Sequence, residues 1–496
     1  MPKNISDLAA RVESGPVSRR QILRAGAVVG GGLVAAACAP SGVTPNPSSG
    51  ASAVPAVTTV VNQGQLQPAP ANAAPTGWDT AQSLRLGLQQ LATFDDSGPA
   101  AWDPAAHPQV YFTSEGQGYT HRPSGSYKLV GFQAIDAVTK KVFAAPKFDL
   151  GYKQYGTPHG LGVSPNGQWI YVPTSDNTAN AMQGPNGEGR LLVINAKTFK
   201  LHQIFTFARE GFHHITAFTD WQGRQRVLLQ TQTLRKFILD PNDNNRVVDG
   251  YTVEDVMMPM GHPYNTVDPT GKYLYISLSS TPLRDANGMT GIAKVDMEKN
   301  TVVTVLGMLA ANNIGQAHTA DGKFSYFNDS IQSQVYKLDN KTNTFVGKTS
   351  AGVAGPYGLT LNWNETEAWS LGKGESSHNT GGNIGIIDTK LFKATNNPEF
   401  NQPVDIQGAI IDHVILHPDP AVNEMWVTSA GTWETIVVDA TSKKVKARIP
   451  SPHGGDTHSG AFVRYASDFK GELLADMGGP QKKMYAVKAE KAAAVK

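Results

Sequence analysis

The sequence predicts an all-β protein in which one short β-unit is repeated around a ring. Composition is the first indication, because 50 Gly, 31 Pro and only 17% charged residues among 496 favour short strands and turns over helices. The second is a recurring hairpin, clearest where Pro158-His159-Gly160 leads to the turn at Asn166-Gly167. The third is that histidine opens almost every copy of this unit. Together they predict a seven-bladed β-propeller.

Residues 1–38 are predicted to be an export signal. Arg19-Arg20 resembles the twin-arginine motif, and an apolar stretch over residues 25–37 ends at Cys38. Cys38 is the only cysteine; either it is lipidated or the signal is cleaved nearby. If it is lipidated, no free thiol remains, which excludes thiolate metal sites and cysteine nucleophiles. Because the twin-arginine route carries folded proteins, we expect the protein in the periplasm or at the outer face of the cell membrane.

Residues 39–78 are rich in Ala, Pro, Ser, Gly and Asn, which predicts a disordered, flexible linker. The propeller is expected to occupy residues 79–496 and to begin with a short helix capped by Asp79. No apolar run reaches the roughly 18 residues that a spanning helix needs, so membrane contact is expected only through a lipid anchor. The net charge of +2 gives no support for nucleic-acid binding.

A second repeated pattern marks the outer part of each blade. An apolar strand ends in Asp or Asn, and Lys follows within a few residues, as in Asp296 to Lys299 and Asp339 to Lys341. This pattern suits a tight turn between two outer strands. The strands of residues 109–147 have no histidine-led start, so they are expected to complete the last blade and close the ring.

One repeat position carries histidine in six of seven units. The equivalent positions lie 39 to 56 residues apart, loosely matching the period of about 40–50 residues of a blade. Because the innermost strands line the central channel, equivalent residues on them should converge on the axis at one face. The predicted set is His159, His214, His262, His318, Tyr357, His413 and His458, with His213 beside His214.

Such a set of imidazoles predicts a metal centre. Imidazoles directed at one axis repel each other when protonated, which favours the neutral form that binds borderline metals. An all-nitrogen set favours copper over calcium, magnesium or structural zinc, and more than four ligands favours two or three ions. The alternative is that each histidine bonds to the backbone of a polar channel.

Two stretches carry a resemblance to a known family. Residues 316–323 and 330–337 resemble a segment of the nitrous oxide reductase propeller, and His213-His214 resembles its adjacent ligand pair. In that enzyme, however, the pair precedes the His-Gly segment, whereas here it follows His159-Gly160. The chain also lacks the cysteines of that enzyme's cupredoxin domain. It is more similar to thiocyanate dehydrogenase, whose propeller stands without that domain. This resemblance implies a trinuclear, histidine-ligated copper centre that oxidises thiocyanate to cyanate and sulfur.

The function expected from these observations is a periplasmic copper oxidoreductase. Its substrate would be a small inorganic anion or gas, and an external electron acceptor such as a cytochrome c would reoxidise it. The candidate catalytic residues are Lys373, Asp412, Asp456 and Tyr357, with Arg209 as a further candidate cation. The alternatives are a nitrous oxide reductase relative without the cupredoxin domain, a non-enzymatic propeller that binds a partner, and a propeller of the d1-haem type.

Overall fold

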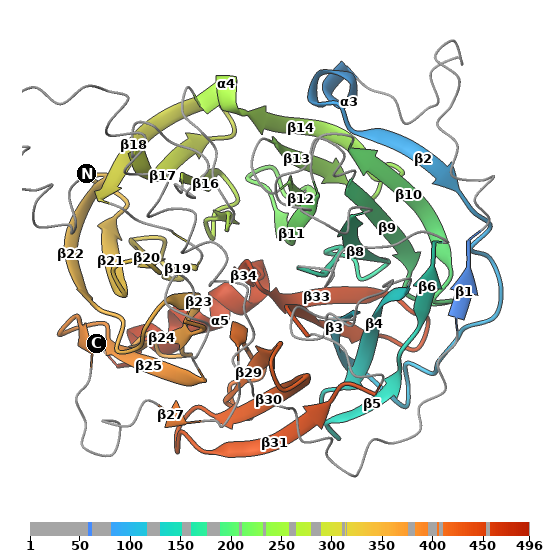
Figure 1. The fold of residues 1–496 in the computed structure, drawn as a ribbon. Coiled ribbons are helices and arrows are strands. Elements are labelled where there is room, and N and C mark those ends of the chain that lie inside the picture. Colours follow the sequence, from blue (N-terminus) through green and yellow to red (C-terminus); the bar gives the residue numbers. More distant parts are fainter. Residues whose placement is uncertain are drawn as a thin grey trace, which may run out of the picture.

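The computed structural model describes fifteen parts of the chain. These are residues 58–61, 81–116, 129–150, 160–175, 189–207, 211–231, 235–256, 264–278, 289–309, 313, 315–374, 382–394, 404–405, 410–452 and 457–495. The described strands form seven sheets around one axis (Figure 1). The predicted export signal, with Cys38, lies outside the described residues.

Four of the sheets take four strands in simple sequence order. Their strands are β11 (Phe212–Thr219), β12 (Gln225–Thr231), β13 (Arg235–Asp240), β14 (Arg246–Thr252); β15 (Thr266–Val267), β16 (Tyr273–Leu278), β17 (Met289–Asp296), β18 (Thr301–Leu309); β19 (Gln316–His318), β20 (Phe324–Asp329), β21 (Gln334–Asp339), β22 (Thr344–Ser350); and β28 (Ile411–Leu416), β29 (Glu424–Ser429), β30 (Glu434–Asp439), β31 (Val445–Pro450). The first strand lies towards the centre and the last on the outside, as β11 and β14 or β19 and β22 show in Figure 1. We call these first strands the inner strands.

Two further sheets have five strands each. They consist of β7 (Gly162–Val163), β8 (Trp169–Ser175), β9 (Gly189–Asn195), β10 (Leu201–Phe207) and β2 (Gln89–Thr93), and of β23 (Pro356–Leu361), β24 (Glu367–Gly372), β25 (Asn383–Asp388), β26 (Lys393–Ala394) and β27 (Val404–Asp405). The predicted N-terminal helix is α3 (Ala81–Leu86), which lies against β14. Arg235, at the start of the neighbouring β13, donates from Nε to the Leu86 carbonyl at 3.0 Å. A second short helix, α4 (Val253–Val256), follows β14.

The seventh sheet joins the two ends of the chain. It contains β1 (Thr58–Val60), β3 (Gln109–Gly116), β4 (Leu129–Asp136), β5 (Lys141–Ala144), β6 (Lys147–Asp149), β32 (Gly460–Tyr465), β33 (Gly471–Asp476) and β34 (Gly479–Pro480). β3 pairs with β32 from Gln109–Arg464 to Thr113–Gly460, so the predicted closure of the ring is confirmed. The other six sheets are blades built mainly from segments that are neighbours in the sequence. The prediction of seven blades includes this composite sheet as the seventh blade.

The predicted flexible linker is corrected at one point. β1, which lies inside residues 39–78, pairs in parallel with β6, from Thr58–Lys147 to Val60–Asp149. β-Branched residues dominate this short segment, and such residues favour extended backbone. The rest of the predicted linker lies outside the described residues.

Both predicted turn patterns occur. In the hairpin that follows an inner strand, the amide of the fourth turn residue donates to the carbonyl of the first turn residue. Examples are Gly167 to Ser164 and Gly322 to Thr319, both at 2.8 Å. These glycines have φ of 68°, a conformation that costs glycine nothing. At the outer turns a carboxylate accepts two backbone amides, as Asp296 does from Glu298 and Lys299. The ends of these strands are therefore set by hydrogen bonds and glycine conformations within the turns.

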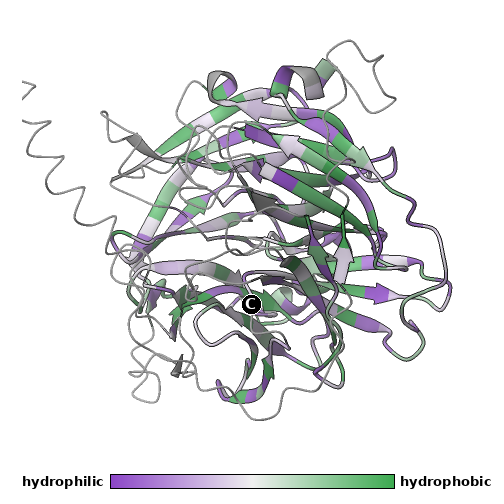
Figure 2. Ribbon diagram, turned by 45° about the vertical axis from the view of Figure 1, so that its right-hand side comes forward, coloured by the Kyte–Doolittle hydropathy of each residue, from purple (hydrophilic) through white to green (hydrophobic). Residues whose placement is uncertain are grey.

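The core lies between the blades. Hydrophobic and hydrophilic residues alternate in bands along the strands (Figure 2), as a pleated strand with two unlike faces requires. Trp426 of β29 shows how neighbouring sheets meet, since its ring centroid lies 4.9 Å from Tyr111 and 5.1 Å from Phe462 of the composite sheet. No helix in the described part of the chain is both long and apolar enough to cross a bilayer.

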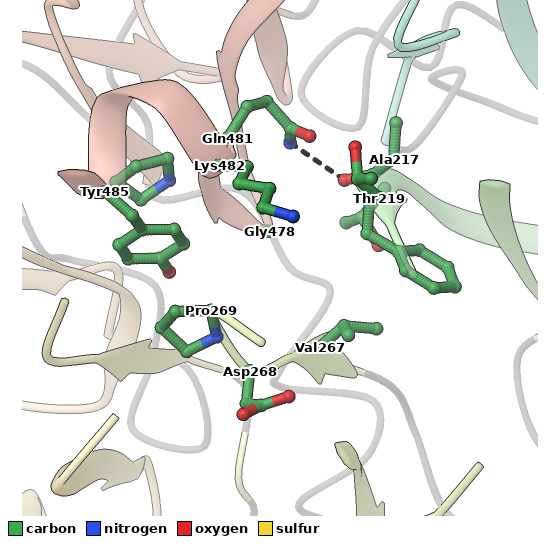
Figure 3. Close-up of a pocket in the computed structure, with 12 residues that line it drawn as sticks. Ala217, Thr219, Val267, Asp268, Pro269, Gly478, Gln481, Lys482 and Tyr485 are labelled. Carbon is green, nitrogen blue, oxygen red and sulfur yellow. Dashed lines mark hydrogen bonds between the residues drawn. The ribbon is translucent and has the colours of Figure 1, made fainter. Parts of the chain in front are cut away.

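The C-terminal segment crosses the centre of the ring. β34 and α5 (Lys482–Ala493) lie there in Figure 1, and β33 runs towards them. Contact with Ala217, near the end of β11, places this segment at the end of the channel where the inner strands finish. Gln481 donates from Nε2 to the Ala217 carbonyl of β11 at 2.8 Å, across a small hollow shown in Figure 3. On the other side, Lys488 donates from Nζ to the carbonyls of Leu361 and Asn362 at 3.1 and 2.7 Å. We call residues 471–495 the C-terminal plug.

Candidate metal centre

Three buried histidines meet at the other end of the channel. His214 lies on β11, His413 on β28, and His458 just before β32. One potential ligand atom from each lies within 4.8 Å of the other two. The ring centroids are 5.0 Å apart for His214 and His413, 5.2 Å for His413 and His458, and 5.7 Å for His214 and His458. This triad could hold a metal ion.

A repeated irregularity of the inner strands places these side chains. In β11 the pairing register with the next strand shifts between Phe212 and Ile215, on either side of the two histidines. The same shift brackets Asp412-His413 in β28, and Tyr357-Gly358 in β23. A β-bulge adds a residue on one strand and redirects side chains. In three inner strands, a bulge at the same place therefore turns residues near the start of the strand towards the axis.

The backbone around the triad is held by hydrogen bonds. Thr428 of β29 accepts from the His413 amide at 3.1 Å and donates to the His458 carbonyl at 2.7 Å. The His458 amide donates to the Ser114 hydroxyl at 3.0 Å. One threonine thus ties together the two segments that carry His413 and His458, which fixes their spacing before any metal binds.

Glycine allows neighbouring inner segments to approach the triad closely. A β-carbon on Gly160, which has φ of 69°, would lie 2.6 Å from the His214 Cα and 2.7 Å from its Cδ2. A β-carbon on Gly358 would lie 2.9 Å from the His413 Cα. Real β-carbons do not make contacts this short. The glycine that follows the repeat histidine, or Tyr357, therefore makes room for the next blade.

Two buried tyrosines enclose His413. Tyr264 stacks on it with centroids 5.5 Å apart and an interplanar angle of 20°, and also meets His214 at 5.7 Å. Tyr357 meets it at 5.0 Å, and its hydroxyl lies 3.4 Å from Nε2 of His458. Burial raises the pKa of Tyr264 well above its ordinary value, so this phenol stays neutral. On the side of His413, the triad is thus packed against uncharged aromatic side chains.

A buried ion pair lies directly behind the triad. Lys373 places Nζ 2.7 Å from Oδ1 of Asp412, and Oδ2 of the same carboxylate lies 3.4 Å from Nδ1 of His458. The ammonium also sits 3.9 Å from the centre of the Tyr357 ring. A carboxylate on the far side of an imidazole selects its tautomer and orients it. Three residues predicted as catalytic, Lys373, Asp412 and Tyr357, are therefore brought together beside one histidine of the triad.

His318 is the described histidine of the predicted set that the structure does not bring to this centre. Its Nδ1 lies 2.7 Å from the Ser325 hydroxyl and its Nε2 lies 2.7 Å from the Thr266 hydroxyl. Burial lowers its pKa to about 3, so it stays neutral. Since both ring nitrogens bond to hydroxyls, the expectation that His318 is a ligand is corrected here. The alternative of a histidine bonded to the backbone does not describe this residue either, because its ring partners are side-chain hydroxyls.

The remaining predicted site residues divide into two groups. His213 adjoins the triad, with its ring centroid 3.8 Å from that of His214 and 6.5 Å from that of His458. His159, His262, Asp456 and Arg209 lie outside the described residues. Sequence reasoning missed Tyr264. Its only sequence signal is its place two residues after His262, a spacing that periodicity alone does not single out.

The chain is a β-propeller. No protein-family profile and no curated protein matches its sequence. Among solved structures it is similar to a chain of the "Crystal Structure of Mitotic Checkpoint Complex", with a TM-score of 0.45 and 13% identity over 64% of this chain and 86% of that one. It is also similar to "Dihydro-heme d1 dehydrogenase NirN in complex with DHE", with a TM-score of 0.42 and 14% identity over 75% and 78% of the two chains.

Proposed function

We propose that this protein is a copper-dependent oxidoreductase acting on a small inorganic anion, similar to thiocyanate dehydrogenase, in a ring of seven blades that includes the composite sheet. The observation that carries the proposal is the buried triad of His214, His413 and His458. Three residues from separate blades, drawn together by bulges and backbone hydrogen bonds, form a preorganised donor set.

The donor set fits copper. Imidazole nitrogen suits copper and zinc, whereas oxygen ligands suit magnesium and calcium. Two nitrogens on one ion lie at most about 4 Å apart, given metal–nitrogen bonds of about 2 Å, so small rotations bring the triad onto one ion. We propose His213, His159 and His262 as further ligands, for two or three ions in all. When bound, copper supplies a one-electron redox couple at the centre.

The chain's own residues would orient and isolate this centre. Oxidation of thiocyanate by water to cyanate and sulfur releases two protons and two electrons, so the site must position an anion and a water. Asp412 lies 3.4 Å from Nδ1 of His458 and would orient this ring, and Lys373 neutralises Asp412. Tyr264 and Tyr357 exclude water from the sides of His413. The C-terminal plug covers the opposite end of the channel, so we infer that the substrate enters from the histidine face.

We also propose that the protein is exported folded by the twin-arginine route and that a one-electron carrier such as a cytochrome c accepts its electrons. The export proposal is supported by Arg19-Arg20, the apolar stretch and Cys38. Replacing both arginines with lysine should retain the protein in the cytoplasm, as measured by cell fractionation. Export of the variant at the wild-type level would contradict the twin-arginine route.

Copper loading tests the proposed function. We expect two or three copper ions per purified chain, an electron paramagnetic resonance signal typical of nitrogen ligation, and bleaching of that signal by thiocyanate. His413→Gln should lose at least one ion. The control His107→Gln changes a half-exposed histidine beside Asp136 and should lose none. Acid-labile sulfide in the centre would favour the nitrous oxide reductase relative, and absence of bound copper would leave the non-enzymatic propeller.

A further inference from the structure

The blade that begins with β19 contributes no residue to the triad, yet it contacts a side chain that packs on the triad. Its inner strand pairs with β20 without a register shift. The first residue of that strand, Gln316, is 2% exposed and bonds to Tyr264 of the neighbouring blade. Tyr264 in turn stacks on His413. A single side chain, that of Tyr264, therefore lies between Gln316 and the triad.

Hydrogen bonds hold the backbone at Tyr264. Gln316 donates from Nε2 to the Tyr264 carbonyl at 2.7 Å, and the Ser277 hydroxyl donates to the same carbonyl at 2.5 Å. The next residue, Asn265, accepts from the Ser277 amide at 2.8 Å and donates to Oε1 of Gln230 at 2.5 Å. Because the tyrosine ring is attached to this fixed backbone, these bonds help to set where the ring meets the triad.

The orientation of the Gln316 side chain follows from groups that can only accept. A backbone carbonyl has no proton to donate, so the atom that faces Tyr264 must be the amide nitrogen Nε2. The same nitrogen donates to Oδ1 of Asn313 at 3.0 Å. Asn313 is oriented independently, since its Nδ2 donates to the Asn328 carbonyl at 2.7 Å. The side-chain oxygen of Gln316 therefore faces away from Tyr264.

That orientation determines which nitrogen of His318 carries the proton. Oε1 of Gln316 can only accept, so the Thr266 hydroxyl donates to it at 2.6 Å. This hydroxyl has a single proton, so it must accept from Nε2 of His318, 2.7 Å away. Burial lowers the pKa of the ring to about 3 and keeps it neutral, so Nδ1 carries no proton. Nδ1 therefore accepts from the Ser325 hydroxyl at 2.7 Å.

We propose that the directed chain of hydrogen bonds from His318 through Gln316 positions Tyr264 against the triad. The inference rests on the proposed function, since a metal held by the triad is what the positioned ring would serve. The repeat histidine of this blade then contributes to the centre without binding metal. Because Tyr264 limits how His413 can rotate, loss of the chain should loosen that imidazole. Gln316, Thr266 and His318 are thus positioning residues.

The first test needs no metal. Two-bond ¹H–¹⁵N correlation spectra of the full chain, labelled in histidine, distinguish the two neutral tautomers, and His318→Gln assigns the signal. We expect His318 near neutral pH as the tautomer with its proton on Nε2. A protonated ring, or a proton on Nδ1, would overturn the proposal, because the chain could not then run towards Tyr264.

A matched pair of threonines tests the link to the triad. Thr266→Val removes the hydroxyl in the middle of the chain at nearly constant shape, and should change the ring signals of both His318 and His413 in metal-free protein. Thr389→Val is the control, since the hydroxyl of this buried residue donates to the Glu365 carbonyl at 2.6 Å, outside the chain. It should leave both signals in place. Unchanged His413 signals in Thr266→Val would overturn the proposal.

Copper adds a second readout. Thr266→Val and Gln316→Leu should each weaken copper binding about tenfold, the lower end of the range for groups behind a metal ligand, and should alter the hyperfine splitting of the electron paramagnetic resonance signal. Thr389→Val should match wild type. Wild-type spectra and affinity in both chain variants would overturn the proposal. If wild type binds no copper, the proposed function fails, and the metal-free signals of His413 still decide whether the chain positions Tyr264.

Discussion

Replacing Gly160 with alanine tests the geometry of the metal centre directly. The added β-carbon would lie 2.6 Å from the His214 Cα and 2.7 Å from its Cδ2, so the loop or the histidine must move. Gly160 also has φ of 69°, a conformation that costs other residues about 1–2 kcal/mol. Overpacking a tight contact adds about 1–3 kcal/mol. The variant should therefore lose about 2–5 kcal/mol of unfolding free energy.

Gly322→Ala is the matched control. Its φ is 68°, but a β-carbon there meets nothing within 4 Å. It should lose only the conformational cost of about 1–2 kcal/mol, and it lies outside the triad. The difference between the two variants isolates the contact with His214 from the shared backbone cost.

Two assays separate the outcomes. Urea unfolding of metal-free protein measures the stability difference, and copper titration against a competing chelator measures affinity at the triad. Gly160→Ala should bind copper at least tenfold more weakly than wild type, while Gly322→Ala should match wild type. Equal stability losses together with unchanged copper affinity in both variants would refute the close approach of Gly160 to His214.

Three further predictions concern buried charges. Burial raises the pKa of Asp476 to about 7, against about 3.9 for an exposed aspartate, so the folded state binds this proton more tightly than the unfolded state. Its contribution to stability should fall by about 4 kcal/mol as pH rises from about 4 to about 7. Asp476→Asn should remove this slope, seen as the pH dependence of the difference in urea unfolding between variant and wild type; identical slopes would contradict it. Lys373→Met breaks the buried pair with Asp412 and should cost about 3–5 kcal/mol. Adding Asp412→Asn should recover most of that loss, and a double-mutant cycle without coupling would argue against the pair. Lys488→Met removes two hydrogen bonds from α5 to the ring, so amides of α5 should exchange with deuterium faster while those of β11 do not; unchanged exchange in α5 would count against its role in holding the plug.

The fold was accessible from sequence because its signals are local. A proline–asparagine–glycine turn, or an aspartate followed by lysine, sets the backbone over four or five residues whatever surrounds it. The ring closure through residues 109–147 also followed from a local fact, the missing histidine-led start. The pairing of Thr58–Val60 with β6 could not be predicted in this way, because a pattern of three residues is too short to indicate a partner strand far along the chain.

The repeat, its turns and the recurring histidines follow from the sequence alone. Their position along the inner strands does not, because His214 and His413 lie near the start of their strands whereas His318 is the last residue of β19. The folded structure shows which of those histidines come together. His214 and His413 turn to the axis because bulges shift their strands, whereas His318 meets the hydroxyls of Thr266 and Ser325, one of them from the neighbouring blade. Likewise, only the folded structure brings Tyr264 and Lys373 next to the triad. The repeat shows which residue types recur, but the chemical role of each side chain depends on neighbours tens or hundreds of residues away.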